Sequence, residues 1–530
     1  MKSIIKFDKK RVYILLLLSI IIFHGLNNYI ILKKDTVPLN GHEGANYVES
    51  VQRYEHTLSS PYQSIYPPLL LLSSQPLYRI FGTNNDIAVM TNMIFFAILI
   101  FSTYGIGKVM RDEETGLLAA FTVSMFPAIF GFSRLYLPDF ALTAVITLGV
   151  YLLIKTNDFQ DKKYSLLFGL ITGLGMLTKW TYAIFLIPPS VIILFKSFFN
   201  KRITRRLIFN LFLIASLAIA ISSFWYFPHI KNGLLQTLIT ASTYADKNFI
   251  YLSSLKGSLL GFGYFIISPF CLFLFIFSKN KIKYELFSWL IVPLFFFSFL
   301  PTQSPRYILP LLPSLALIIS LSILRLQGTI KRIRLFQQSK KVGYLIVTAF
   351  LLFGLMQFFF LSYNKFDQFT SVDSILRQNT GLMHAQHADW ELEEVYQLLD
   401  STKDKPDQTR IVCASLVPLS SVMLHYSIIN HLPIRFDYPI YCLERDKIYC
   451  SHDKYPDLIK NADYVIIESE EWEKNLHWLA ALGRDHKKDF DAFIEEFKKQ
   501  KNNFELVKRV YLNKEFDDSS LYFYKKRDLK

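Results

Sequence analysis

Long apolar runs alternate with short polar stretches over the first 361 residues of the chain. Runs such as Leu207–Phe227 and Val342–Leu361 approach the ~20 apolar residues that a helix needs to cross a bilayer. Only helices can cross in an open chain, because lipid offers backbone groups no hydrogen-bonding partners. The pattern predicts about eleven spans, near residues 12–32, 88–107, 115–132, 139–154, 164–179, 181–196, 207–227, 257–277, 285–300, 307–324 and 342–361.

The pattern changes from residue 362, where charged residues become dense. Apolar residues there alternate with polar ones, as in half-buried strands, in four segments: Arg410–Leu416, Asp463–Glu468, Phe504–Leu512 and Leu521–Lys525. Helical spacing occurs at Asp389–Asp400 and Asp489–Lys499, and a hairpin turn is expected around Asp517–Ser520. The chain is therefore predicted to be a polytopic α-helical membrane protein over 1–361, with long outer loops at 33–87 and 228–256, followed by a soluble α/β domain over 362–530.

Composition and charge agree with this division. The chain is 52% hydrophobic and 16% aromatic, with a mean hydropathy of +0.27, which is too apolar for a soluble protein of 530 residues. Its net charge of +15 does not indicate a nucleic-acid partner, because Lys and Arg concentrate in alternate connections. By the positive-inside rule those connections and the N-terminus are cytoplasmic, and an odd number of spans puts the α/β domain outside.

Two further features concern the first span and the cysteines. The first apolar run continues to about Leu32 without a small-residue cleavage site, so it is expected to be a retained anchor rather than a signal peptide. Cys271 lies in a predicted span, and Cys413, Cys442 and Cys450 lie in the exported domain. Cys442 and Cys450 are the nearest candidates for a disulfide, with buried free thiols as the alternative.

Polar side chains gather at the predicted outer ends of the spans: Glu43, Tyr47, Tyr66, Arg134, Asp139, Lys179, Arg306 and Tyr307. Taken singly, Lys179 and Arg306 are typical of cations that anchor a helix end at the membrane surface. Together with the carboxylates they suit a reaction in which a lipid-linked phosphate leaves and a hydroxyl attacks. An acid would then act as general base, and the cations would hold the leaving phosphate.

At these residues the chain resembles the GT-C glycosyltransferases of the family-39 type, which include lipid A aminoarabinose transferase and the protein O-mannosyltransferases. The resemblance covers about the first 360 residues and consists of six elements in order: the acid-containing first loop, Tyr66–Leu69, Ser133–Asp139, Gly173–Lys179, Trp225-Tyr226 and Arg306–Pro313. It implies the GT-C fold and transfer of a sugar from a polyprenyl-phosphate donor, reached from the outer leaflet, to a lipid, glycan or protein acceptor. The transfer would invert the anomeric carbon and need no nucleotide. Separately, the Lys-, Ile-, Asn- and Phe-rich composition favours a bacterial source, and with it a bacterial plasma membrane and an undecaprenyl carrier.

The resemblance also implies roles for individual residues. Glu43 matches the first acid of the first loop and would be the general base, with Asp139 as the competing candidate. Tyr47 matches the tyrosine of that loop, whereas Gly44 replaces its second acid. Tyr66 stands where some members have a lysine that contacts phosphate.

This leaves Arg134, Lys179 and Arg306 as alternatives for binding the donor phosphate, and Tyr307 adjoins the last of them. Asp139 matches the acid of the second outer loop and would orient a sugar hydroxyl or a cation. Glu49 and Glu55, in the first loop, are expected on a solvated face. The exported domain is expected to guide the acceptor rather than to carry chemistry.

Two other classes of function stay open at this point. A transporter or flippase of lipid-linked glycans is disfavoured, because few ionisable residues lie near the centres of the predicted spans. A non-catalytic scaffold for envelope assembly would keep the fold, with Gly44 and Tyr66 marking loss of activity. The sequence has no ligand spacing for zinc and no Asp-x-Asp in the first loop, so no cofactor is assigned and a divalent metal stays possible.

Overall fold

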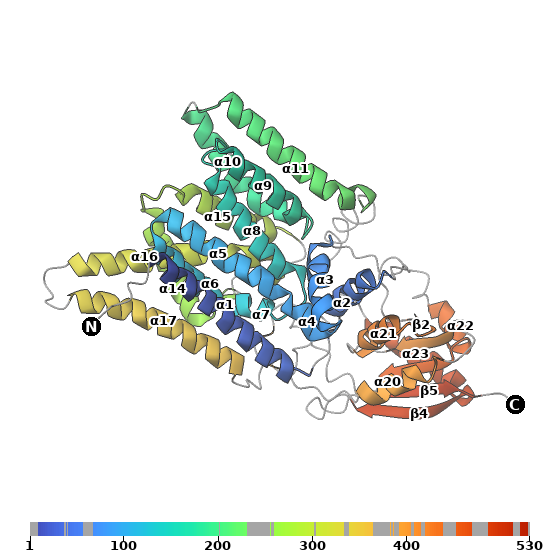
Figure 1. Cartoon of the computed structure of the whole chain (residues 1–530). Coiled ribbons are helices and arrows are strands. Elements are labelled where there is room, and N and C mark those ends of the chain that lie inside the picture. The colour runs from blue at the N-terminus through green and yellow to red at the C-terminus, as the bar shows by residue number, and fades with distance from the viewer. Residues whose placement is uncertain are drawn as a thin grey trace. The chain divides into compact units, whose positions relative to one another are not determined.

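The computed structural model describes residues 9–36, 39, 41–56, 67–200, 202–229, 255, 259–300, 304–332, 339–363, 382, 385, 392–403, 408–414, 419–437, 452–468, 486–511 and 520–527. The chain divides into two compact units (Figure 1). The helical unit comprises Met1–Lys34, Gln63–Lys365 and Ile375–Ala385, and the α/β unit comprises Asp35–Tyr62, Phe366–Ser374 and Gln386–Lys530. The start of the predicted first outer loop thus belongs to the α/β unit, and the predicted division at residue 361 stays a prediction.

The helical unit consists of helices joined by short connections. They are α1 (Lys9–Lys34), α3 (Leu69–Phe81), α4 (Asn85–Met90), α5 (Asn92–Met110), α6 (Glu113–Ser124), α7 (Pro127–Phe132), α8 (Pro138–Lys155), α9 (Lys162–Met176), α10 (Tyr182–Phe199), α11 (Arg205–His229), α14 (Phe262–Ile276), α15 (Lys283–Ser298), the 3-10 helix η3 (Pro305–Leu311), α16 (Leu312–Arg332) and α17 (Ser339–Tyr363). Each of the predicted spans coincides with one or more of these helices.

Among the residues that the structure describes, seven helices are long and apolar enough to cross a membrane: Lys9–Lys34, Asn85–Met110, Pro138–Lys155, Tyr182–Phe199, Arg205–His229, Pro305–Ile330 and Lys341–Tyr363. The other predicted spans are shorter helices. The span predicted at 115–132 is interrupted, because α6 ends at Ser124 and Pro127 begins a new helix. At 1.5 Å per residue, the 15 residues of α9 extend only about 22 Å, less than the ~30 Å of a bilayer core.

The interior of the helical unit is formed by α8 and α16, whose residues are mostly buried. The outermost helices instead present apolar side chains to the surroundings. Most of α11 is exposed, and it packs on α9 at the edge of the unit (Figure 1). Phe227 of α11 is 82% exposed. A surface of this kind is favourable against lipid and unfavourable in water.

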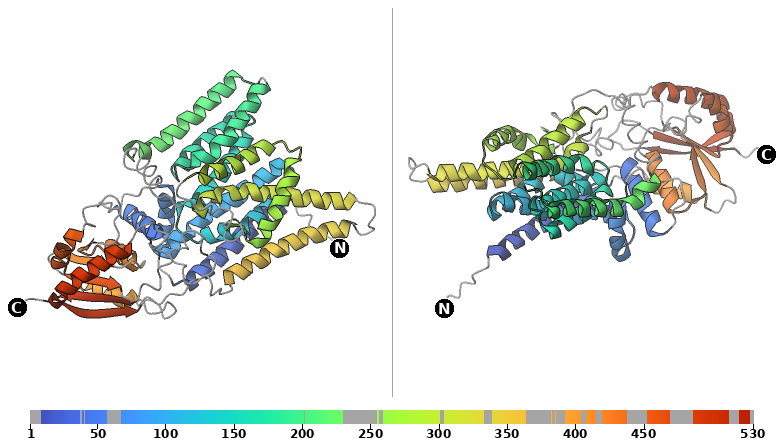
Figure 2. Two further views of the ribbon diagram at one scale, coloured as in Figure 1. Left: turned by 180° about the vertical axis from the view of Figure 1, so that it is seen from behind. Right: turned by 90° about the horizontal axis from the view of Figure 1, so that it is seen from above.

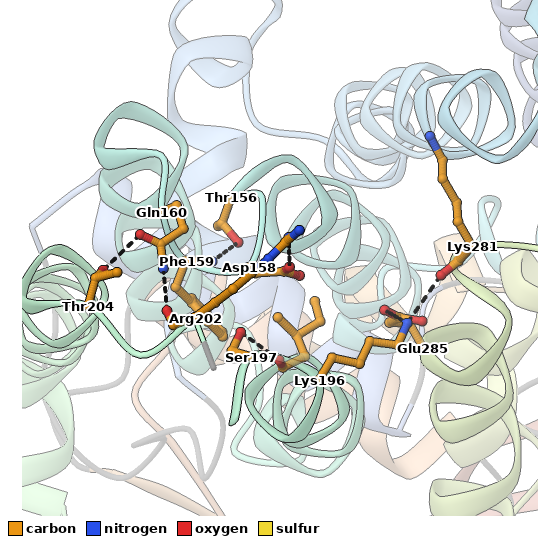
Figure 3. A network of polar contacts seen from close by, with 11 residues as sticks. Thr156, Asp158, Phe159, Gln160, Lys196, Ser197, Arg202, Thr204, Lys281 and Glu285 are labelled. Atoms are coloured by element: carbon orange, nitrogen blue, oxygen red, sulfur yellow. Dashed lines mark hydrogen bonds and ion pairs between the residues drawn. The ribbon is translucent and has the colours of Figure 1, made fainter. Parts of the chain in front are cut away.

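Basic connections meet at one end of the helical unit (Figure 3). Gln160, between α8 and α9, donates from Nε2 to the carbonyl oxygen of Arg202, between α10 and α11, at 3.0 Å. Lys196 donates from Nζ to Glu285 Oε1 at 2.5 Å and to the Lys281 carbonyl at 3.1 Å. These segments are among the basic connections that the sequence predicts on the cytoplasmic side, so the structure joins segments predicted to share a side.

The α/β unit is built on a five-stranded sheet with the order β2-β1-β3-β5-β4. β1 is parallel to β2 and β3, whereas β5 is antiparallel to β3 and β4. The strands are β1 (Thr409–Ala414), β2 (Ile434–Asp437), β3 (Tyr464–Glu468), β4 (Phe504–Tyr511) and β5 (Ser520–Lys526), and the helices are α2 (Gly41–Tyr54), α20 (Leu392–Asp400), α21 (Leu419–Ile429), α22 (Tyr455–Lys460) and α23 (His486–Gln500), with 3-10 turns η5 (His452–Lys454) and η8 (Lys501–Asn503). The α/β fold predicted for the C-terminal region is confirmed.

Helices cover both faces of this sheet. Ile411 and Cys413 of β1 pack with residues of α20 and α21, whereas Val412 and Ala414 pack with residues of α22 and α23. The α23 helix runs along one face of the sheet (Figure 2). The alternation of side chains along β1 thus separates two apolar cores, as the period of two requires. Cys413 and Cys271 are both buried, and the predicted Cys442–Cys450 pair lies outside the described residues.

Candidate active site

A buried ion pair lies at the start of α8 in the helical unit. Asp139 is in the first turn of this helix, directly after Pro138 at its first position. Lys179 follows the end of α9, and its Nζ donates to Asp139 Oδ1 at 2.9 Å. The Lys179 and Asp139 side chains are only 6% and 3% exposed. The structure therefore brings together two residues that the sequence placed on different outer ends of spans.

Arg306 and Tyr307 of η3 complete this group. The Lys179 Nζ lies 5.2 Å from the centroid of the Tyr307 ring, and the guanidinium carbon of Arg306 lies 5.7 Å from the same centroid. Both distances are in the range of cation–π contacts. Arg306 is also close enough to Asp139 to attract it electrostatically. We call Asp139, Lys179, Arg306 and Tyr307 the Asp139 cluster.

The Asp139 cluster carries two cations and one carboxylate, with Lys179 and Asp139 buried and Arg306 half-buried. A lysine and an arginine placed close together are groups that proteins use to bind phosphate and carboxylate anions. Among the described residues there is no group of three or more His, Cys, Asp or Glu side chains that could hold a metal ion. The chemistry that the cluster itself offers is anion binding by a lysine and an arginine, with one acid to hold them in place.

Other elements singled out in the sequence lie next to this cluster. The backbone nitrogen of Leu69, directly after the two prolines, donates to the Leu177 carbonyl at 2.9 Å. Tyr226, near the end of α11, donates from Oη to the Met176 carbonyl at 2.9 Å. Both contacts reach the turn that carries Lys179. Tyr66 lies outside the described residues, so its predicted role is untested by the structure.

Arg134 lies in a different part of the helical unit and is completely buried. Its Nε donates to Asn28 Oδ1 at 2.8 Å, and its two terminal nitrogens donate to the Leu382 carbonyl and to Ser362 Oγ, each at 3.2 Å. These contacts join α1, the segment before α8, α17 and residue 382. We therefore regard Arg134 as a structural residue, although the sequence left it as an alternative for phosphate binding.

Glu43 and Tyr47 lie on α2 in the α/β unit. They are 1% and 8% exposed and are one helical turn apart, so they share a face of the helix. Glu49 is also buried, and its Oε1 accepts from Arg53 Nη2 at 2.6 Å. The expectation that Glu49 lines a solvated face is wrong, because Glu49 is only 2% exposed. Glu55 is exposed and lies 3.7 Å from His431 Nε2.

Sequence reasoning missed the partners that come from distant segments. Asn28 and Ser362 surround Arg134, and His425 lies against Gly44, but no local pattern links either set. His425 in particular resembles any buried histidine of an amphipathic helix when only the sequence is read. An alignment of covarying positions is the kind of information that would have found such pairs.

The comparisons with known proteins agree with the fold and with the sequence elements. Residues 66–227 match the family model described as dolichyl-phosphate-mannose-protein mannosyltransferase, and this range includes Asp139 and Lys179. No curated protein matches the sequence.

Three solved structures share the fold. The chain is similar to ArnT from Cupriavidus metallidurans in the apo state, with a TM-score of 0.61, 11% identity and coverage of 97% of this chain and 98% of ArnT. It is similar to the same ArnT bound to undecaprenyl phosphate, with a TM-score of 0.58, 11% identity and coverage of 96% and 98%. It is also similar to the oligosaccharyltransferase AglB from Archaeoglobus fulgidus in complex with an inhibitory peptide and a dolichol-phosphate, with a TM-score of 0.51, 12% identity and coverage of 96% and 75%.

The fold and the family match confirm the resemblance seen in the sequence. Similarity to ArnT over nearly all of both chains establishes the fold, including the helical and α/β units. The family match adds evidence from the sequence itself over the segment that carries the buried ion pair. The chain is therefore a multi-pass membrane protein with the GT-C fold of ArnT, and residues 66–227 match the model of the dolichyl-phosphate-mannose-protein mannosyltransferase family.

Proposed function

We propose that the protein transfers a sugar from a polyprenyl-phosphate carrier to a lipid, glycan or protein acceptor outside the cytoplasm, with inversion at the anomeric carbon. The observation that carries the proposal is the Asp139 cluster, in which the buried Lys179–Asp139 pair lies inside the family-matched segment and Arg306 and Tyr307 lie beside it. The related ArnT and AglB structures contain undecaprenyl phosphate and dolichol-phosphate, which supports a polyprenyl-phosphate donor.

Lys179 and Arg306 are assigned to the donor phosphate. As the bond between the anomeric carbon and the phosphate oxygen breaks, that oxygen keeps the electron pair and its negative charge increases. Cations fixed beside it stabilise this charge without reorganising, which is an effective way to lower a barrier. Asp139 holds Lys179 through the 2.9 Å contact, and its second oxygen is assigned to a hydroxyl of the sugar.

Glu43 is assigned as the general base. The acceptor hydroxyl loses its proton to this carboxylate while its oxygen forms the new bond to the anomeric carbon, on the face opposite the departing phosphate. Attack from the opposite face inverts the configuration. A positioned base of this kind typically contributes ~10²–10⁴-fold. The assignment rests on the position of Glu43 in the first loop of a chain with this fold.

Localisation in a bacterial plasma membrane, with a cytoplasmic N-terminus and an external α/β unit, belongs to the same proposal. The basic connections that meet at one end of the helical unit support this orientation, because they are the segments that the positive-inside rule retains in the cytoplasm (Figure 3).

The test compares Glu43→Gln with Glu55→Gln, an exposed acid of the same helix region. A strain lacking the protein is complemented with each variant at equal abundance, and its envelope lipids and glycans are compared by mass spectrometry. We expect the product to be lost with Glu43→Gln and kept with Glu55→Gln. Purified Glu43→Gln protein should still bind undecaprenyl phosphate, because it keeps the cations.

Full product with Glu43→Gln would contradict the base assignment. If Asp139→Asn were then inactive while still folded, Asp139 would take that role. If no variant of either residue altered any envelope product, the protein would be a scaffold with this fold and the proposed function would be wrong.

A further inference from the structure

The helix that carries Glu43 packs on α21, within the α/β unit. The contact is closest at Gly44, the residue next to Glu43. A Cβ placed on Gly44 would lie 2.3 Å from both Cε1 and Nδ1 of His425 and 2.8 Å from the Leu39 carbonyl oxygen. Real Cβ atoms do not approach other atoms so closely. Only glycine at position 44 therefore leaves room for the His425 imidazole where it lies.

His425 is held in this position from several directions. Its side chain is 6% exposed, and it forms a hydrogen bond with the backbone of Leu39, which itself is 7% exposed. Burial lowers the pKa of His425 to about 4, and the hydrogen bond with Leu39 only partly opposes this effect. The imidazole is therefore neutral near pH 7 and can lie in an apolar contact without a counter-ion.

We infer that His425 is a positioning residue for Glu43, and that Gly44 is the notch in α2 that receives its imidazole. The inference rests on the proposed function, because it gives the α/β unit a part in catalysis through Glu43. The imidazole fixes the first turn of α2 against α21 and so fixes the rotation of the helix. A displacement of about 1 Å in a catalytic group can reduce turnover ~10²-fold.

The inference also accounts for an odd feature of the sequence. Position 44 is where the resemblance predicts a second acid, and any side chain there would overlap His425. An acid at 44 and an imidazole at 425 are mutually exclusive in this arrangement. Gly44 is thus explained by the packing of α2 on α21 and does not indicate loss of activity.

The second histidine in this contact serves as a control. His431 lies 3.7 Å from Glu55 at the other end of α2, but its side chain is 63% exposed and that of Glu55 is 35% exposed. Ion pairs of this kind typically contribute at most ~1 kcal/mol. Loss of His431 should therefore leave the position of α2 nearly unchanged, although the two histidines belong to the same contact.

The experiment uses full-length protein in lipid nanodiscs, with the variants Gly44→Ala, His425→Ala, the double variant and His431→Ala. Three quantities are measured: amide hydrogen exchange of residues 41–54, binding of undecaprenyl phosphate, and the envelope product in complemented cells. We expect His425→Ala and Gly44→Ala each to accelerate exchange in 41–54 and to reduce product about tenfold or more, with binding of undecaprenyl phosphate within about threefold of wild type.

The double variant distinguishes a specific contact from general damage. Removing the imidazole makes room for a methyl group at position 44, so adding Gly44→Ala to His425→Ala should reduce product by less than about twofold. If the fold-reductions in product of the two single variants multiplied in the double variant, the inference would be overturned. Unchanged exchange in 41–54 with His425→Ala would overturn it as well, and so would an equal effect of His431→Ala.

The Glu43→Gln variant separates the failure of this inference from that of the proposed function. If Glu43→Gln makes normal product, the base assignment is wrong, and the inference falls with it. If Glu43→Gln is inactive while His425→Ala and Gly44→Ala are both active, only the inference is wrong.

Discussion

Asp139, in the first turn of α8, and Lys179, just after the end of α9, form an ion pair. Both side chains are almost completely buried. Two charges removed from water lose several kcal/mol of hydration each, and mutual attraction only just offsets this loss. The pair therefore contributes little net stability, and its value lies in presenting a fixed cation to a ligand. This relationship gives the first prediction.

Replacing one member of the pair should be much more harmful to stability than replacing both. Lys179→Met or Asp139→Asn alone leaves the other member of the pair buried without its ion-pair partner, which costs about 3–5 kcal/mol. The double variant should recover most of this stability but bind undecaprenyl phosphate at least about tenfold more weakly than wild type, because the cation is missing. Thermal unfolding in detergent and direct binding measure the two effects.

The Lys33–Asp86 pair is a matched control, since its N–O distance is 2.6 Å but its side chains are 54% and 30% exposed. Lys33→Met should change stability by less than about 1 kcal/mol. Equal losses at Lys33 and Lys179 would show that burial of the Asp139 cluster is not what matters.

Arg134 and Arg306 should respond differently to the same substitution. Arg134→Met removes the hydrogen bonds to Asn28, Leu382 and Ser362, so we expect a fall in folded yield and a lower unfolding temperature. Arg306→Met should leave the unfolding temperature nearly unchanged and weaken binding of undecaprenyl phosphate about tenfold. Size-exclusion yield, thermal unfolding and binding are measured in parallel. The opposite pattern would return Arg134 to the donor site.

Much of the fold could be predicted because its physical causes are local. Apolar runs located the seven described helices that are long and apolar enough to cross a membrane, and alternation located β1, β3, β4 and β5. β2 was missed because four residues, Ile434–Asp437, are too few to show a period. The break after Ser124 was missed because the apolar run continues through it, and only Pro127 marks the new helix.

The candidate site could be predicted less well, because the type of a residue does not reveal how deeply its side chain is buried or which partners it has. Lys179 and Arg134 are both cations near predicted helix ends, yet Lys179 donates to a carboxylate, whereas Arg134 donates to the neutral side chains of Asn28 and Ser362. Likewise Glu43 and Glu49 are acids of one polar segment, and both are buried. The side chain that lies against Gly44 is His425, far along the chain, and no local pattern links the two.

The orientation in the membrane can be tested with reporter fusions. Alkaline phosphatase, which is active only outside the cytoplasm, should be active when fused after Lys530 and inactive when fused after Arg202, in the basic connection of Figure 3. A cytoplasmic reporter should give the reverse result at both sites. An active phosphatase at Arg202 together with an inactive one at Lys530 would invert the proposed topology.

The buried histidine of the α/β unit predicts a dependence of local stability on pH. The pKa of His425 is lowered from 6.5 to about 4, chiefly because burial removes hydration from the imidazolium. Between these values the unfolded segment binds a proton and the folded one does not. The contribution of the neutral His425 imidazole to local stability is therefore fully present above pH 6.5 and is lost as the pH falls from about 6.5 to about 4.

Amide hydrogen exchange in α2 and α21, corrected for the intrinsic effect of pH, measures this loss in the full-length protein. Between about pH 7.5 and about pH 5, proton linkage predicts that the free energy of opening falls by about 2 kcal/mol, a change of about 30-fold in the opening equilibrium. His425→Gln carries no titrating ring, so its exchange should vary much less with pH. His431→Ala should behave as wild type, since that imidazole is 63% exposed. If wild type and His425→Gln showed the same dependence on pH, another group would have to carry the titration, and the buried imidazole would not be what destabilises the α2–α21 contact in acid.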